Sequence, residues 1–121
     1  HDARVIPIDG RPHLPSSIRQ YQGDSRGHWQ AGTLVIETTN FLRETSFRGS
    51  SANLRLTERL TRVGADTLVY EFTVYDPQTW TKPWSVAVPM RKMNEPIYEY
   101  ACHEGNYAMR NILSGARAAE R

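Results

Sequence analysis

Apolar and polar residues alternate most regularly in the middle of the chain. Within Asn53–Val63 the even positions run Leu, Leu, Glu, Leu, while the odd positions between them are arginine or threonine. After a Gly-Ala-Asp turn, Thr67–Tyr75 places Leu, Tyr, Phe and Val at its even positions. Alternation with a period of two is typical of a strand that has one apolar face and one wet face. The two segments therefore predict an antiparallel hairpin with one face in a core.

Weaker strand patterns flank this hairpin. Thr33–Phe41 is rich in β-branched residues, and Trp84–Met90 again alternates. Further strands are expected around Trp29, over Arg4–Asp9 and over Ile97–Glu104. A helical pattern is found only near the end, from about residue 106 to 120, where alanine and isoleucine recur on one face.

About seven short, closely spaced strands predict an all-β fold, closed or nearly closed into a barrel or sandwich. Jelly rolls, cupins and lipocalin-like barrels all fit this pattern. We expect a single domain over residues 1–121, a small antiparallel jelly-roll or cupin-like barrel with a short C-terminal helix. A chain of 121 residues is long enough for one apolar core and too short for two.

Charge and composition narrow the classes of partner. The net charge of +2 arises from 15 basic and 13 acidic residues that are well interspersed, which argues against nucleic acid as a partner. No apolar run approaches the roughly 20 residues of a membrane helix, so no membrane partner is expected. The single cysteine, Cys102, excludes a disulfide within one chain.

The first residue, His1, suggests metal chemistry. An N-terminal histidine offers its α-amino group and its imidazole, and both lose their protons readily near neutral pH. Joined by further histidines, such a residue favours copper among the divalent first-row ions. If a leader was removed to leave His1, the protein is secreted or periplasmic. The alternative is that a fragment boundary falls at this histidine.

Two other histidines are candidate metal ligands. His13 closes a turn in the long segment 10–27, and His103 lies near the end of the last expected strand. Because the first and last strands of an antiparallel barrel are often neighbours, His1, His13 and His103 are expected to converge on one ion. The same residues have simpler explanations, since His13 could cap a turn and His103 could bond to a neighbouring group.

Two polar residues near His103 are candidates for the chemistry around the ion. Glu104 and Tyr107 follow closely in sequence and could orient a ligand or relay a proton. The histidine spacing matches no compact zinc motif.

Exposed aromatic side chains are candidates for sugar stacking. Trp80 stands in the turn before Trp84, and Tyr21 and Trp29 lie in or near the long segment. Flat rings at a rim hold sugar rings by stacking and C–H contacts. Trp84 is in phase with the apolar positions of its strand and is expected in the core.

Four segments carry a resemblance to known proteins. They are IPIDGRPH (6–13), LVIETTNF (34–41), DPQTWTKPW (76–84) and YEYACHEGNY (98–107). They resemble a widespread group of exported bacterial proteins of unassigned function, and the likeness spans nearly the whole chain. Members of that group are often longer at the N-terminus, which favours a fragment boundary at His1.

In size and character the chain also resembles the cellulose oxidative cleaving enzyme type, a dimeric, cupin-like jelly roll with one copper held mainly by histidines. This resemblance implies a copper ion at the three histidines and oxidation of cellulose, or a related β-glucan, at chain ends to an aldonic acid. It also implies a homodimer. The alternative is a non-enzymatic exported β-barrel module that binds carbohydrate or a partner protein.

Overall fold

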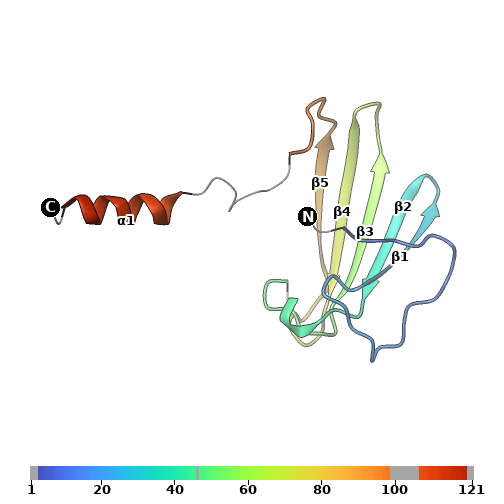
Figure 1. Cartoon of the computed structure of the whole chain (residues 1–121). Coiled ribbons are helices and arrows are strands. Elements are labelled where there is room, and N and C mark those ends of the chain that lie inside the picture. The colour runs from blue at the N-terminus through green and yellow to red at the C-terminus, as the bar shows by residue number, and fades with distance from the viewer. Residues whose placement is uncertain (1–2, 46, 99–106, 120–121) are drawn as a thin grey trace.

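The computed structural model describes residues 3–45, 47–98 and 107–119. Its body is one antiparallel sheet in the order β1-β2-β3-β4-β5, so each strand pairs with its neighbour in sequence (Figure 1). This confirms the all-β class and the short C-terminal helix. The elements are β1 (Asp24–Gln30), β2 (Thr33–Thr39), a 3-10 turn (Arg43–Thr45), β3 (Arg55–Arg62), β4 (Thr67–Tyr75), β5 (Trp84–Arg91) and α1 (Ala108–Ala119).

The predicted central hairpin is confirmed, and its strands pair in the expected phase. Glu58 lies opposite Phe72 and Leu60 lies opposite Tyr70. The β1–β2 hairpin turns through only two residues, Ala31 and Gly32, and both have positive φ. That conformation matches the twist of the flanking strands and allows the tightest hairpin connection.

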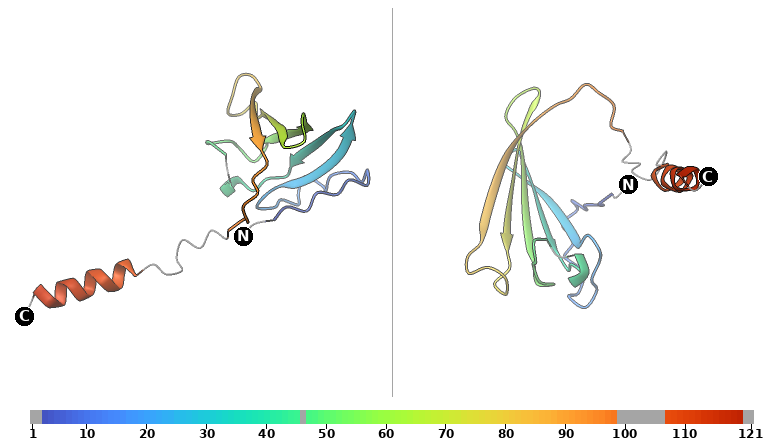
Figure 2. Two further views of the ribbon diagram at one scale, coloured as in Figure 1. Left: turned by 90° about the horizontal axis from the view of Figure 1, so that it is seen from above. Right: turned by 90° about the vertical axis from the view of Figure 1, so that its left-hand side faces the viewer.

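The predicted closure into a barrel is not seen in the described residues. The sheet is curved but open, with β1 and β5 as its two edges (Figure 2). The first and last described strands are therefore not neighbours. The expectation that His1, His13 and His103 converge assumed that they would be. The sequence predicts a strand over Arg4–Asp9, but this segment forms no strand in the structure. Most of the predicted strand Ile97–Glu104 lies outside the described residues, and its first two residues are not in a strand.

Residues 3–14 form what we call the N-terminal strap, which passes round the edge of β1. At one end Arg4 forms an ion pair with Glu58 on β3, with 2.8 Å between Nη1 and Oε2. The carbonyl of Pro7 then accepts a hydrogen bond from the backbone N–H of Gly27, at the outer edge of the sheet. Pro7 has no N–H of its own, and this favours an edge contact over a full sixth strand.

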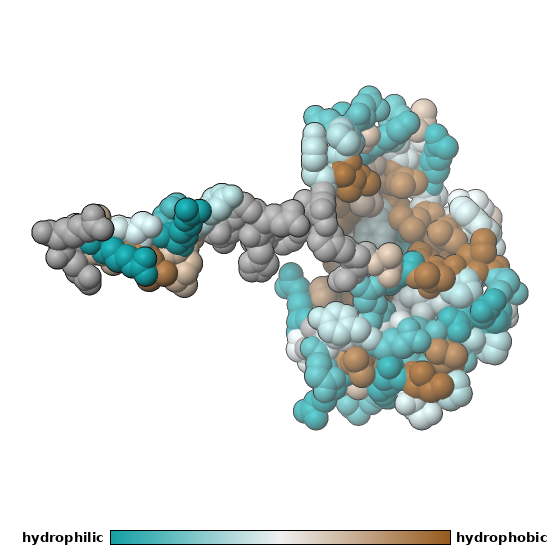
Figure 3. Space-filling view, viewed as in Figure 1, coloured by the Kyte–Doolittle hydropathy of each residue, from teal (hydrophilic) through white to brown (hydrophobic). Residues whose placement is uncertain are grey.

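Alternation divides the sheet into two faces of different character. We call the face that carries Ile36, Leu60, Phe72 and Val88 the apolar face, and the strap crosses it at Arg4. Apolar side chains cluster on this side of the molecule (Figure 3). The opposite face, the polar face, carries Arg26, His28, Glu37, Thr39, Arg55, Thr57, Arg59, Glu71, Thr73, Tyr75, Ser85 and Ala87.

An aromatic cluster closes one end of the apolar face. Trp84 stacks on Phe47 with 6.1 Å between ring centroids and meets the ring of Phe72 edge-on at 5.9 Å. Val74 and Leu54 are fully or almost fully buried. Trp84 thus packs into the core, as its phase in the strand predicts.

The helix α1 lies apart from the sheet (Figure 1). Among the described residues it packs against none of the five strands, and none of its residues is buried. No helix in the described part of the chain has the length and apolarity needed to span a membrane.

Candidate functional site

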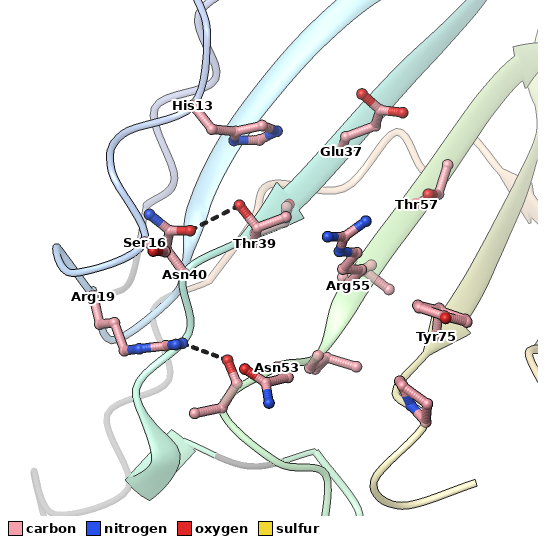
Figure 4. A pocket seen from close by; sticks show the side chains of 15 residues that line it. His13, Ser16, Arg19, Glu37, Thr39, Asn40, Asn53, Arg55, Thr57 and Tyr75 are labelled. Carbon is pink, nitrogen blue, oxygen red and sulfur yellow. Dashed lines mark hydrogen bonds between the residues drawn. The ribbon is translucent and has the colours of Figure 1, made fainter. Parts of the chain in front are cut away.

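A pocket of about 730 Å³ opens on the polar face, between the chain that follows the strap and the ends of β2, β3 and β4 (Figure 4). Most of its lining residues carry hydroxyl, amide or charged side chains, and apolar residues such as Leu54 and Leu56 complete the wall. The polar and aromatic side chains of the lining include His13, Ser16, Arg19, Glu37, Thr39, Asn40, Asn53, Arg55, Thr57 and Tyr75.

The strand register brings the polar groups of the pocket together. Glu37 on β2 lies opposite Thr57 on β3, and Arg55 lies opposite Tyr75 on β4. Because residues two apart on a strand point to the same side, Arg55 and Thr57 share this face. Three strands thus supply a carboxylate, a guanidinium, a hydroxyl and an aromatic ring to one surface.

Asn40 holds the loop that forms one wall of the pocket. Its backbone is left-handed, with φ of 58°, a conformation that asparagine tolerates better than most residues. Its buried side-chain nitrogen lies 3.0–3.1 Å from the carbonyl oxygens of Leu14, Pro15 and Ile18. Its own oxygen accepts a hydrogen bond from the Thr39 hydroxyl at 3.0 Å. One side chain therefore joins the loop to the end of β2.

Arg19 ties the same wall to the opposite side of the pocket. Its guanidinium donates to the carbonyl of Phe41 at 3.2 Å and to the carbonyl of Ala52. Figure 4 shows this side chain reaching across the lower end of the pocket. The guanidinium of Arg19 is therefore occupied by backbone carbonyls and has a structural role. Arg55 is the lining residue whose guanidinium is better placed to bind a ligand.

Asp76 fixes the loop at the base of the pocket. Its buried carboxylate accepts hydrogen bonds from the backbone N–H of Ser51 at 2.6 Å, the Ser51 hydroxyl at 2.9 Å and the Thr79 hydroxyl at 2.8 Å. Burial opposes ionisation of this carboxyl, but the hydrogen bonds together outweigh it and lower its pKa. A charged Asp76 thus holds the segment that carries Asn53.

His13 is anchored from behind by a buried carboxylate. Its Nδ1 lies 3.0 Å from Oδ2 of Asp24, which also accepts from the N–H of Leu14 at 3.0 Å. Arg26 donates to the other oxygen of Asp24 at 2.7 Å. Burial works against ionisation of Asp24, yet these hydrogen bonds prevail and lower its pKa. With Nδ1 engaged, Nε2 is the ring nitrogen of His13 left for a ligand.

The other predicted metal residues cannot be placed beside His13. His1, His103 and Glu104 lie outside the described residues. Tyr107 is described and stands exposed just before α1. Within the described ranges, no group of three histidine, cysteine, aspartate or glutamate side chains is placed to hold a metal ion. The convergence of His1, His13 and His103 therefore stays a prediction.

The predicted stacking aromatics lie in three separate places. Trp29 is exposed at the end of β1, on the apolar face, and Tyr21 is exposed in a turn. Trp80 is half-buried and packs edge-on against Trp84, with 5.4 Å between ring centroids. None of the three lines the pocket, whose aromatic ring is Tyr75. The signal for Tyr75 in the sequence is an aromatic residue in the polar phase of a strongly alternating strand.

Comparisons with protein-family models, with curated proteins and with solved structures found no match to this chain.

Proposed function

We propose that the protein is a carbohydrate-binding module and that the pocket on the polar face is its binding site. The observation that carries this proposal is the convergence of side chains from three strands on one open pocket beside a partly exposed tyrosine ring. Sugars present hydroxyl groups round the rim of a ring and C–H groups on its faces. A site for them combines placed donors and acceptors with an aromatic surface.

Each lining group has a task in such a complex. The carboxylate of Glu37 accepts hydrogen bonds from sugar hydroxyls, and the guanidinium of Arg55 donates them. The Thr57 hydroxyl, which lies opposite Glu37 and two residues from Arg55 on β3, can do both. Tyr75, 44% exposed, offers its ring to the C–H face of the sugar. These groups stand on paired strands, which hold them more precisely than loops would.

Isothermal titration calorimetry with cello-oligosaccharides tests this proposal. We expect Arg55→Ala to weaken binding about tenfold, since a hydrogen bond to a charged group contributes roughly 1.5 kcal/mol. Tyr75→Ala should weaken binding by a similar factor, because it removes the aromatic surface against the sugar. Arg59→Ala is the matched control, because Arg59 lies on the same strand and face but outside the pocket. No heat of binding with any β-glucan oligosaccharide, or an equal loss in all three variants, would contradict the proposal.

The pair His13–Asp24 favours a second candidate function, a copper-dependent oxidase of cellulose chain ends. Metal-binding histidines usually donate their other ring N–H to a carboxylate, and Asp24 is placed for that role. In this proposal His13 is one ligand, and His1 and His103 supply the others. The bound copper would supply the redox chemistry, while the polar-face pocket would hold the glucan end beside His13.

Electron paramagnetic resonance during a copper(II) titration tests this second candidate. It predicts one tight site per chain whose signal changes and whose affinity falls in His13→Ala and in His103→Ala. His28→Ala is the control, since His28 is exposed on β1 and does not line the pocket. Unchanged copper affinity in the first two variants removes the oxidase proposal. Carbohydrate binding that survives chelation supports the binding module alone.

A further inference from the structure

Among the described residues, no helix or strand packs over the part of the apolar face that β4 and β5 form, and side chains there are exposed. The strap covers the side of β1, where Ile6 and Ile8 lie against Gly27. Beyond it, Leu68, Val86, Val88 and Met90 are 38–48% exposed. A soluble protein rarely leaves a contiguous apolar surface of this kind without a partner.

The helix α1 carries a matching apolar surface that is also uncovered. Met109, Ile112 and Leu113 are 49–69% exposed, and together with Ala116 they follow the i, i+3, i+4, i+7 spacing of one helical face. Polar residues occupy the other side, among them Asn111. An isolated helix of 12 residues is at best marginally stable in water, so α1 needs a surface on which to pack.

The two surfaces fit each other in size. Twelve helical residues extend for about 18 Å, and strands of eight or nine residues for about 26–30 Å. A helix about 10 Å wide covers two to three strands spaced roughly 4.8 Å apart. At one end of this face lies a hollow of about 490 Å³ that can receive a side chain of the helix. Leu68, Met90 and the stems of Arg62, Arg91 and Lys92 line it, together with the turn between β3 and β4.

We propose that α1 of one chain packs on the uncovered apolar face of a second copy, and that the second copy returns the contact. The helix lies apart from its own sheet, and no strand of its own chain contacts it in the described structure (Figures 1 and 2). Reciprocal exchange gives a closed two-fold dimer in which both apolar surfaces are covered. The polar-face pocket stays open on the outside of each copy.

Light scattering after size-exclusion chromatography tests the proposal. The full chain should elute with twice its mass of 13.9 kDa. Ile112→Asp should weaken dimerisation at least tenfold, because it places a charge in the centre of the buried helix face. Asn111→Asp, which adds the same charge on the opposite side of the helix, should leave the dimer intact.

A second pair of variants tests the sheet side of the contact. Val88→Asp should weaken the dimer, whereas Ala87→Asp, one residue away on the polar face, should not. Circular dichroism establishes that each variant keeps its sheet. A wild-type monomer overturns the proposal, including one in which α1 folds back on its own sheet and Ile112→Asp only lowers stability. A dimer that survives both Ile112→Asp and Val88→Asp overturns it as well.

Discussion

Asp76 is the residue on which the base of the pocket depends. It connects the end of β4 to Ser51 and Thr79, and so joins two loops that are distant in sequence. Asparagine at this position keeps the size of the side chain but replaces an accepting oxygen by an NH₂ group. At least one of the buried donors then loses its partner.

We therefore expect Asp76→Asn to lower the free energy of unfolding by about 1–3 kcal/mol, the usual cost of a buried unsatisfied group. Urea denaturation measures this loss. Asp66→Asn, in the exposed turn between β3 and β4, is the control and should change little. Equal stability of the two variants would show that the bonds of Asp76 are not important.

The lowered pKa of Asp76 also predicts how the stability of the protein depends on pH. The pKa of Asp76 is lower in the folded protein than in the unfolded chain, where it is about 3.9. Its ionised carboxylate therefore stabilises the fold above that unfolded pKa, and this stabilisation is lost as the pH falls through the folded pKa. The free energy of unfolding of the wild type should therefore decrease as the pH falls below about 4. Asp76→Asn should show a shallower dependence in that window, and an unchanged slope would contradict this assignment.

Tyr70 and Glu58 form a polar contact within the apolar face. The Tyr70 hydroxyl donates to Oε1 of Glu58 at 2.7 Å, and the ion pair of Glu58 with Arg4 fastens the strap to the sheet. Burial of Tyr70, aided by its bond to the Glu58 carboxylate, raises the pKa of the phenol to about 12.

An alkaline titration tests this contact. A group whose pKa is raised on folding stabilises the protein below its unfolded pKa, about 10 for tyrosine, and loses that effect as pH rises through the folded value. The difference in tyrosinate absorbance between the wild type and Tyr70→Phe should appear near pH 12. A difference centred near pH 10 would mean that Tyr70 is solvated and unbonded.

At the scale of elements, the strap depends on the absence of a side chain at Gly27. A Cβ atom there would stand 2.9 Å from Cγ2 of Ile8 and 3.0 Å from Cγ2 of Ile6. Gly27→Ala should therefore displace the strap and cost about 1–3 kcal/mol, as overpacking does. Trypsin should then cleave faster after Arg4, which is followed by valine, whereas Arg11 is protected in any case because proline follows it. Gly115→Ala, which meets open space in α1, is the control and should not alter this cleavage.

The hairpin shows what the sequence can predict about elements. The bounds of β4 agree with the prediction residue for residue, because each even position is apolar and each odd position is polar or faces the polar side. The strap shows what it cannot predict. Val5, Ile6 and Ile8 favour a strand by composition, yet the edge of β1 and the ion pair of Arg4 decide their path. Closure of a sheet likewise depends on pairing between distant segments, which local alternation does not specify.

The pocket residues cannot be recognised in the sequence for a similar reason, because they come together only through contacts between distant segments. Glu37, Arg55 and Thr57 occupy the phase of the strands that alternation marks as wet, where charged residues are ordinary. Only the register of three strands and the loop held by Asn40 brings them together. The sequence predicts His13 as a candidate from its residue type, but its anchoring by Asp24 is visible only in the structure.

On the scale of the whole molecule, the two faces of the sheet have separate proposed tasks. We propose that the polar face binds a sugar beside His13 and that the apolar face over β4 and β5 receives the helix of a second copy. Because the faces are opposite, a variant that breaks the dimer should leave the sugar affinity unchanged. Ile112→Asp combined with the calorimetric titration checks this independence, and coupled losses would show that one surface serves both purposes.

The most direct test of the binding proposal is a nuclear magnetic resonance titration of the isotopically labelled protein with cellohexaose. The amide signals of Thr39, Thr57 and Tyr75 should shift together and saturate, and Arg55→Ala should raise the sugar concentration needed for half-maximal shifts about tenfold. Absence of any shift at saturating sugar, or shifts confined to Trp29 and the apolar face, would contradict a carbohydrate site in the polar-face pocket.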